Sequence, residues 1–232
     1  GLGQAIAERL AEAGADIAVA DRSRSEATGD LVRGHGRRFV GVECDVSDPA
    51  EVSAFAQKVR YELGSVDILV NNAAIMRKIT FEDISYQDWQ RFLGVNLGGA
   101  FLMVQAFLAD LKASSAGRVI NLASGSIWLN VPQMVHYVTT KAALVGFTNS
   151  LAAELGACGV TVNAIAPSVV RTPGAEAMEG ADQDFGLVVG MQAIRRLQTP
   201  QDVANMAVYL ASEEASFITG QTISVDGGLP LR

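Results

Sequence analysis

The chain has 232 residues, 49% hydrophobic and 19% charged, with a formal net charge of −7. This composition is typical of a globular chain, so residues 1–232 are expected to form a single domain that is neither disordered nor fibrous. The negative charge disfavours nucleic acid and anionic membranes as partners, and no apolar run approaches the ~18 residues of a membrane span. Two cysteines and two histidines provide neither a disulfide framework nor a zinc triad. A reduced, cytoplasmic protein without a metal site is therefore expected.

Short β-branched runs alternate with helical patterns along the chain. Several of the runs are apolar on both faces, as strands in a helix-covered parallel sheet must be. The alternation predicts an α/β fold with a doubly wound parallel sheet of the Rossmann type. The predicted strands are 16–20, 38–42, 66–70, 118–122, 160–164 and 222–225.

Helix signals lie between these strands. Asp48-Pro49 and Thr199-Pro200 each combine a capping side chain with proline at the first helical position. The longest helical stretch is predicted from about Tyr86 to Lys112, and another from about Tyr137 to Gly156. Residues 171–197 show neither a clear strand nor a long helix, and this stretch is predicted to be a substrate loop or lid.

The sequence opens at Gly1-Leu2-Gly3, inside the kind of glycine-rich turn that follows the first strand of a nucleotide-binding sheet. The strand that feeds this turn is absent from the given sequence, and it would lie in the middle of the sheet. Two interpretations follow: a truncated sequence, or a chain in which the flanking strands close over the gap. Cofactor binding is in question under either one.

The first residues also indicate a dinucleotide site. Gly1 and Gly3 would let the backbone approach a pyrophosphate at a helix N-terminus. Asp21 ends the next strand, where a carboxylate accepts from the ribose hydroxyls of NAD and repels the 2′-phosphate of NADP. Two unit charges ~4 Å apart at an effective dielectric of ~20 repel by about 4 kcal/mol. Arg22 and Arg24 could offset this preference, and Asp21 could instead only cap the next helix.

A possible catalytic pair is Tyr137 with Lys141, which share one helix face a turn apart. A phenol has a pKa of about 10, too high for a base near neutral pH, and a nearby ammonium favours the phenolate. Ser124 follows the strand 118–122 at the carboxyl edge, where ligands gather in open α/β sheets. Asn72 and Pro167 follow two further strands at the same edge, so one crevice is predicted.

In combination these motifs resemble the short-chain dehydrogenase/reductase family over nearly the whole chain. Ala74 and Ser168 stand where the family has glycines. The segments that carry the resemblance are Gly1-x-Gly3, Cys44-Asp45-Val46, Asn71-Asn72-Ala73-Ala74, Val95-Asn96, Ser124, Tyr137-x-x-x-Lys141, Asn163-x-x-x-Pro167, Ile218-Thr-Gly-Gln-Thr222 and Val225-Asp-Gly-Gly228.

The resemblance implies roles for individual residues. Tyr137 would be the general acid/base, and Lys141 would lower its pKa and bind the nicotinamide ribose. Ser124 would hold the substrate oxygen, and Asn96 would anchor a water that relays protons. NAD is the implied cofactor. With Tyr137 and Lys141, the residues expected to contact it are Gly1, Gly3, Asp21, Asp45, Val46, Asn72, Ala73, Pro167, Val170 and Thr172.

Within the family, the chain looks most like NAD-dependent secondary-alcohol dehydrogenases of the 1-phenylethanol dehydrogenase type. The substrate would then be a small alcohol or ketone, and methionine and tryptophan side chains would suit an aromatic guest. The candidate substrate-binding residues are Met76, Ser126, Trp128, Met134, Met178 and Met191.

Two other readings remain open. One is a 3-oxoacyl-carrier reductase or a sugar dehydrogenase of the same family, although those reductases usually take NADPH, which Asp21 disfavours. The other is a non-catalytic nucleotide-binding or structural member. The family also implies a homotetramer, with the apolar stretches 101–108 and 142–151 and the C-terminal segment 225–232 between subunits.

Overall fold

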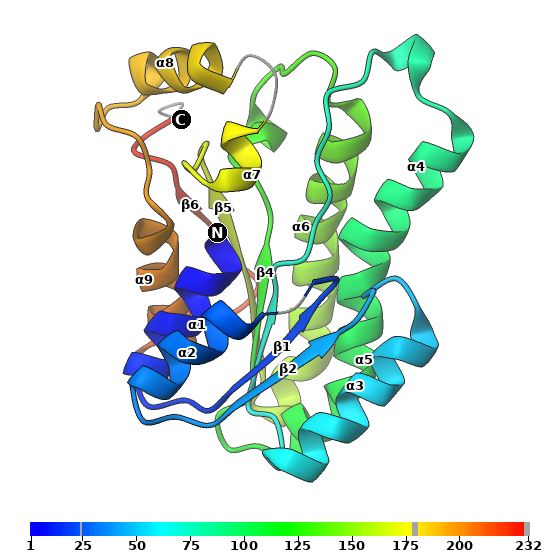
Figure 1. Cartoon of the computed structure of the whole chain (residues 1–232), viewed down its shortest axis with the longest axis vertical. Coiled ribbons are helices and arrows are strands. Elements are labelled where there is room, and N and C mark those ends of the chain that lie inside the picture. Colours follow the sequence, from blue (N-terminus) through cyan, green and yellow to red (C-terminus); the bar gives the residue numbers. More distant parts are fainter. Residues whose placement is uncertain (24, 178–180, 230–232) are drawn as a thin grey trace.

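The computed structural model describes residues 1–23, 25–177 and 181–229. Within them, β1 (Ile17–Asp21) pairs with β2 (Phe39–Glu43), and a second sheet has the order β3 (Ile68–Asn71), β4 (Arg118–Leu122), β5 (Thr161–Pro167) and β6 (Thr222–Val225) (Figure 1). Every ladder is parallel. Each predicted strand is present with a shift of at most a few residues, and the parallel α/β fold is confirmed.

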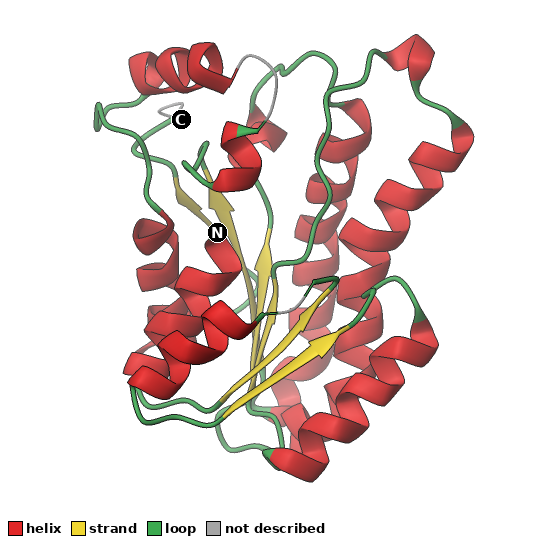
Figure 2. Ribbon diagram, in the orientation of Figure 1, coloured by secondary structure: helices red, strands yellow, loops and turns green. Residues whose placement is uncertain are grey.

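Helices cover both faces of the sheets (Figure 2). One layer holds α1 (Leu2–Glu12), α2 (Glu26–Gly34) and α9 (Pro200–Ala211), and the other holds α3 (Pro49–Glu62), α5 (Gly99–Ala113) and α6 (Val135–Leu155). Successive side chains of a strand point to opposite faces. Val119 of β4 therefore joins the core under α3 and α5, while its neighbour Ile120 joins the core under α1 and α9.

Two helix starts form as their sequences predict. The Asp48 carboxylate caps α3 by accepting from the backbone N–H of Ala50 at 2.7 Å and of Glu51 at 3.1 Å. Thr199 and Asp202 form a capping box at the start of α9. These motifs are local, so the tertiary fold was not needed to predict them.

The two sheets do not join within the described residues. β1 and β3 flank a cavity of ≈ 1130 Å³, whose inner part is lined by Ala18 and Ala20 of β1, Leu69 of β3 and Phe107 of α5. Neighbouring strands lie about 4.8 Å apart in a sheet, and here a wider space separates the two edges. The expectation that the flanking strands might close over a gap is therefore not met.

The structure adds detail to two predicted segments. The stretch expected as one helix over 86–112 consists of α4 (Tyr86–Leu93), a π-helical turn at Gly94–Gly98, and α5. A π-helical turn leaves no mark in hydrophobic periodicity, and such turns are frequent at functional sites. Residues 171–197 contain α7 (Pro173–Glu176) and the longer α8 (Ala181–Met191). Gly186 and Gly190 weaken the helix signal of α8.

The helical stretch Tyr86–Ala113 is, among the described residues, long and apolar enough to cross a membrane by length and composition. It has 28 residues, a mean hydropathy of 1.7 in its most apolar window, and 44% of that window buried inside the molecule. Met103, Val104, Phe107 and Leu111 on its inner face belong to the core. Core helices of water-exposed domains commonly have this composition, so the feature is weak evidence for a membrane span.

Candidate active site

Ser124 stands at the end of β4, where the two central strands approach each other closely. Residues of β4 and β5 are buried along their whole length. A side chain at Gly125 would place its Cβ 3.0 Å from the carbonyl oxygen of Pro167, a tight contact with backbone that favours glycine there. The Ser124 hydroxyl caps the following 3₁₀ turn by accepting from the N–H of Ser126 at 3.2 Å. The hydroxyl is therefore held at the carboxyl edge of the sheet, as predicted.

Tyr137 and Lys141 lie on the first turns of α6, facing that edge. The Lys141 ammonium nitrogen is 5.8 Å from the centroid of the Tyr137 ring and donates to the carbonyl oxygen of Leu122 at 2.6 Å. Burial raises the pKa of the Tyr137 phenol, and a hydrogen bond with Ser124 acts in the opposite direction. The structure thus brings Ser124, Tyr137 and Lys141 together. The lowering of the Tyr137 pKa that the resemblance assigns to Lys141 stays a prediction.

Lys141 itself is almost fully buried, with 3% of its surface exposed. Burial lowers the pKa of its ammonium to about 8 from 10.5. The cause is the loss of hydration, which disfavours the charged form. Near neutral pH the side chain is therefore still largely a cation, close to the pH at which it loses its proton.

Asn96 occupies the π-helical turn and is buried. Its side-chain oxygen accepts from the N–H of Ile75 at 2.8 Å, and its nitrogen donates to the carbonyl oxygen of Ile75 at 3.0 Å and to the Thr140 hydroxyl at 3.1 Å. Thr140 in turn donates to the carbonyl oxygen of Tyr137 at 2.7 Å. Asn96 therefore joins the loop after β3 to the helix that carries the catalytic pair.

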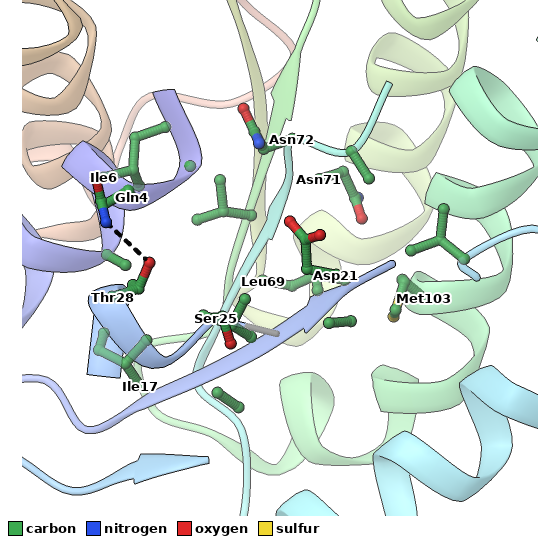
Figure 3. A pocket seen from close by; sticks show the side chains of 18 of the residues that line it. Gln4, Ile6, Ile17, Asp21, Ser25, Thr28, Leu69, Asn71, Asn72 and Met103 are labelled. Carbon is green, nitrogen blue, oxygen red and sulfur yellow. Dashed lines mark hydrogen bonds between the residues drawn. The ribbon is translucent and has the colours of Figure 1, made fainter. Parts of the chain in front are cut away.

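The cavity beside β1 holds most of the residues predicted to bind the cofactor. Figure 3 shows Asp21, Asn71 and Asn72 directed toward this space, which lies beside the start of α1. The first N–H groups of a helix have no partner within it, and they favour an anion. A side chain at Gly3 would approach the Asn72 amide nitrogen to 2.7 Å. The predicted residues that line the cavity are Gly1, Gly3, Asp21, Asp45, Val46, Asn72, Ala73 and Thr172.

The remaining predicted cofactor residues lie outside the lining of this cavity. Pro167 and Val170 are buried at and after the end of β5, and Tyr137 and Lys141 are on α6. This division matches an extended ligand that would run from Asp21 past the start of α1 toward Ser124. These groups fit a dinucleotide, because glycines at a helix N-terminus and a carboxylate at a strand end line the same cavity.

Asp21 is exposed at the end of β1, and a residue of the following turn holds its carboxylate in place. One of its carboxylate oxygens accepts from both the N–H and the hydroxyl of Ser23, each at 2.9 Å. The Arg22 guanidinium lies 3.9 Å from the carboxylate of Asp45. Hydrogen bonds from Ser47 hold the pKa of Asp45 below its usual value, and Arg22 adds to this effect. Arg24 lies outside the described residues.

The predicted substrate residues are dispersed. Ser126 is the one that touches the catalytic group, with its hydroxyl 2.9 Å from that of Ser124. Met134 is buried directly before α6, and Trp128 packs on Ala123, Ala164 and Ala166. Met76 and Met191 are exposed at the loop after β3 and at the end of α8. Met178 lies outside the described residues.

Sequence reasoning missed two buried side chains beside the site. A ring nitrogen of His136 lies 2.9 Å from the carbonyl oxygen of Arg77, and the ring packs edge-on against Phe92. Gln192, directly after α8, donates to the Ser168 hydroxyl at 2.9 Å and to the carbonyl oxygen of Asp226 at 3.1 Å. A single histidine or glutamine carries no spacing signal, so only the tertiary contacts reveal these two residues.

The chain is similar to known proteins over nearly its whole length. The profile of a family described as enoyl-(acyl carrier protein) reductase matches residues 1–230. A subunit of a hydroxy(phenyl)methylsuccinyl-CoA dehydrogenase from Thauera aromatica is 36% identical over 233 residues, covering 100% of this chain and 93% of the relative. D-threitol dehydrogenase from Mycolicibacterium smegmatis is 38% identical over 235 residues, which cover 100% of this chain and 90% of the relative. A solved structure from Sinorhizobium meliloti 1021, described as a short-chain alcohol dehydrogenase, matches with a TM-score of 0.93 and 34% identity. The match covers 99% of this chain and 92% of the solved chain.

Proposed function

Because the chain belongs to the short-chain dehydrogenase/reductase family, and is therefore an oxidoreductase with a nicotinamide cofactor, we propose that it interconverts a secondary alcohol and its ketone with NAD. The observation that carries this proposal is the convergence of Ser124, Tyr137 and Lys141 at the end of β4. That arrangement joins a hydroxyl that can hold a substrate oxygen to a phenol that can exchange a proton with it.

In the proposed mechanism, the bound cofactor would accept a hydride from the alcohol carbon in its oxidised form and return it to the ketone carbon in its reduced form, and the protein supplies orientation and proton transfer. The Ser124 hydroxyl binds the substrate oxygen. The Tyr137 phenol gives its proton to that oxygen during ketone reduction and takes it back during alcohol oxidation. Since burial raises the pKa of Tyr137, the phenol holds its proton near neutral pH and is ready to act as the acid. The Lys141 ammonium, fixed by Leu122, adds positive charge near the ring.

The preference for NAD rests on Asp21. Its carboxylate is exposed at the cavity rim, where it would accept from a ribose and repel a 2′-phosphate. The Arg22 guanidinium lies 3.9 Å from the Asp45 carboxylate, and this ion pair makes Arg22 less available to a phosphate. A direct test is to measure NAD and NADP binding by calorimetry. Tighter binding of NADP would contradict the assignment, and no binding of either would favour a non-catalytic role.

For the substrate we favour an aryl-alkyl alcohol of the 1-phenylethanol type. The Thauera aromatica relative, whose name includes a phenyl-substituted carbinol, supports this choice. The name of the threitol dehydrogenase and the acyl-carrier description of the family support a sugar alcohol or a carrier-bound 3-oxoacyl group as the alternative. Turnover should be compared for 1-phenylethanol, D-threitol and a 3-oxoacyl thioester. Faster turnover of either alternative would replace the aryl-alkyl assignment.

We also propose a cytoplasmic homotetramer. The free thiols of Cys44 and Cys158 suit a reducing compartment. Phe101 on α5 is about half exposed and Phe217 before β6 is fully exposed, and such apolar side chains would be covered by helix and strand contacts between subunits. Sedimentation showing a monomer at micromolar concentration would contradict the assembly.

A further inference from the structure

A second serine hydroxyl lies against the one proposed to hold the substrate oxygen. The Ser126 hydroxyl oxygen is 2.9 Å from that of Ser124, and the N–H of Ser126 also donates to the Ser124 hydroxyl oxygen at 3.2 Å. Ser126 belongs to the 3₁₀ turn Gly125–Trp128 that Ser124 caps, and both serines are half-buried. Ser124 therefore has two contacts with Ser126, one through the backbone and one through the side chain.

The backbone of this turn holds Ser126 in its place. The N–H of Ile127 donates to the carbonyl oxygen of Ser124 at 3.3 Å, and the N–H of Leu129 donates to the carbonyl oxygen of Ser126 at 3.1 Å. Between the two serines, Gly125 packs so closely on β5 that an added Cβ would lie 3.0 Å from a backbone carbonyl oxygen. Because the turn is hydrogen-bonded along its length and packed against β5, the fold sets the distance between the two hydroxyls.

A serine hydroxyl has one proton to donate and two lone pairs that accept. On Ser124, the backbone N–H of Ser126 occupies one lone pair, because an N–H can only donate. One proton and one lone pair are then left for the other two neighbours of Ser124, which are the hydroxyls of Ser126 and Tyr137. When both of these hydrogen bonds form, one of the two hydroxyls donates to Ser124 and the other accepts from it.

The direction of the bond between the two serines decides what Ser124 can hold. If Ser124 donated to Ser126, it would have no proton left for a ketone oxygen, which can only accept. If Ser126 donates to Ser124, the Ser124 proton is free for the Tyr137 phenol or for a substrate oxygen. The hydrogen bond with Ser124 lowers the pKa of the Tyr137 phenol, which is the effect of a group that donates to the phenol oxygen. This effect favours donation from Ser126 to Ser124.

We propose that Ser126 is a positioning residue, which donates its hydroxyl proton to Ser124 and thereby makes Ser124 a donor toward the substrate oxygen. Ser126 then acts through Ser124, in place of the direct substrate contact predicted from the sequence. This order of hydrogen bonds suits an oxygen that accepts, such as that of a ketone. A hydrogen bond to an oxygen that gains negative charge strengthens in the transition state. The identity of the substrate oxygen rests on the proposed function, whereas the order of the hydrogen bonds does not.

Ultraviolet titration of the Tyr137 phenol tests the direction on the protein alone, with the curve of Tyr137→Phe subtracted. Ser124→Ala should raise the pKa of Tyr137, because the phenolate loses a donor. Ser126→Ala should raise this pKa by a smaller amount, and Ser126→Thr, which keeps the hydroxyl, should leave it in place. Ser212→Ala is the matched control, because its hydroxyl donates to the carbonyl oxygen of Tyr209 at 2.8 Å, at the opposite end of β4. A pKa of Tyr137 that falls or stays the same in Ser124→Ala would show that Ser124 does not donate to the phenol, and would overturn the proposal.

Reduction of acetophenone, the ketone of 1-phenylethanol, by reduced NAD then tests the role of Ser126 in the reaction. Ser126→Ala should lower kcat by about 3- to 10-fold with KM unchanged, the loss expected for one hydrogen bond that counts in the transition state. Ser126→Thr should restore kcat. A raised KM at unchanged kcat would show that Ser126 contacts the substrate directly, and no restoration by Ser126→Thr would show a packing role. Either result, or unchanged kinetics in Ser126→Ala, would overturn the proposal. If the phenol titrates as expected but none of the proposed substrates is turned over, the proposed function fails while the order of the hydrogen bonds stands.

Discussion

The catalytic end and the cofactor end of this protein are built differently. β4 and β5, which lead to Ser124 and Pro167, are paired on both sides and buried along their length. β1, which leads to Asp21, pairs within the described residues only with β2 and borders the ≈ 1130 Å³ cavity on its other side. The residues proposed to transfer the proton are therefore held by a continuous core, whereas the carboxylate proposed to select the cofactor is held by local bonds to Ser23.

This difference in strand pairing and burial indicates that the catalytic end is held more rigidly than the cofactor end. A close-packed interior keeps side chains in single rotamers, so Lys141 and Tyr137 can be held with little freedom. An exposed carboxylate at a strand end depends on its own turn and on solvent screening. Substitutions at the catalytic end should consequently have larger effects than those at the cofactor end. The predictions that follow test this contrast, beginning with the largest expected effect.

Replacing Tyr137→Phe should lower turnover of 1-phenylethanol by about 10²–10⁴-fold, the usual contribution of a positioned acid/base. The ring and its packing remain, so the melting temperature and NAD affinity should change little. The measurement is NAD reduction followed by absorbance, with calorimetry as the control for binding. Undiminished turnover would show that the phenol does not transfer the proton.

Replacing Lys141→Met should stabilise the fold near neutral pH while removing activity. Burial lowers the pKa of Lys141 from 10.5 to about 8, so holding the ammonium in the fold costs stability. At about 1.4 kcal/mol per pKa unit, the gain in unfolding free energy is at most about 3 kcal/mol. The cost is fully present below pH 8, and the wild type should gain stability as pH rises from about 8 to 10.5.

Urea unfolding measures the stability of Lys141→Met and the wild type in both pH ranges. Lys112→Met, at the exposed end of α5, is the matched control and should change stability little. A variant less stable than the wild type at neutral pH would mean that the bond to Leu122 outweighs the cost of burying the charge.

At the cofactor end, Asp21→Asn should shift the preference from NAD toward NADP by about 10–100-fold. Removing the charge abolishes repulsion of a 2′-phosphate, but solvent screening keeps the effect below the limit of about 4 kcal/mol. The affinities for both cofactors are measured by calorimetry. Glu43→Gln is the matched control, because Glu43 stands opposite Asp21 in the β1–β2 ladder. An equal shift in the control would indicate a general charge effect.

Replacing one alanine by valine at each end of the molecule compares how tightly the catalytic end and the cofactor end are packed. Ala164 of β5 is 0% exposed and lies in the small core with Ala123 and Ala166, whereas Ala18 of β1 borders the cavity. Ala164→Val should lower the unfolding free energy by about 1–3 kcal/mol through overpacking. Ala18→Val should be neutral or raise it by about 1 kcal/mol, because added methyl groups fill space. Denaturant unfolding measures the free energy of unfolding of both variants. An equal loss of unfolding free energy in the two variants would show that the two ends are packed alike.

The smallest effect concerns pH. Ketone reduction by the wild type should fall severalfold as pH rises through about 8, where Lys141 loses its proton. The direction follows from the lowered pKa of the ammonium, which favours transfer of the phenol proton to the substrate oxygen only while the ammonium is charged. Reduction rates across this range provide the test. A rate that is constant through pH 8 would show that the charge of Lys141 does not assist the reaction.

Much of this site was predictable because its signals are local in sequence. The four-residue spacing of Tyr137 and Lys141, the place of Ser124 after a strand, and the cap at Asp48 each depend on neighbouring residues alone. α8 was not predictable, because its buried face is defined by contacts of Phe185 and Gln192 with distant segments. The π-helical turn at Asn96 was missed for the same reason, since its side chain pairs with Ile75 and Thr140.

The sequence by itself determined the order of strands and helices and pointed to the candidate catalytic residues and the carboxylate at Asp21, since periodicity and spacing are properties of the chain. Only the tertiary structure decided that Ser124 contacts Tyr137, that burial lowers the pKa of Lys141, and that Lys78 meets Asp184. The physical reason is that burial and charge pairing depend on which surfaces meet in space, and segments this far apart in the chain meet only when the sheet and its helices are assembled.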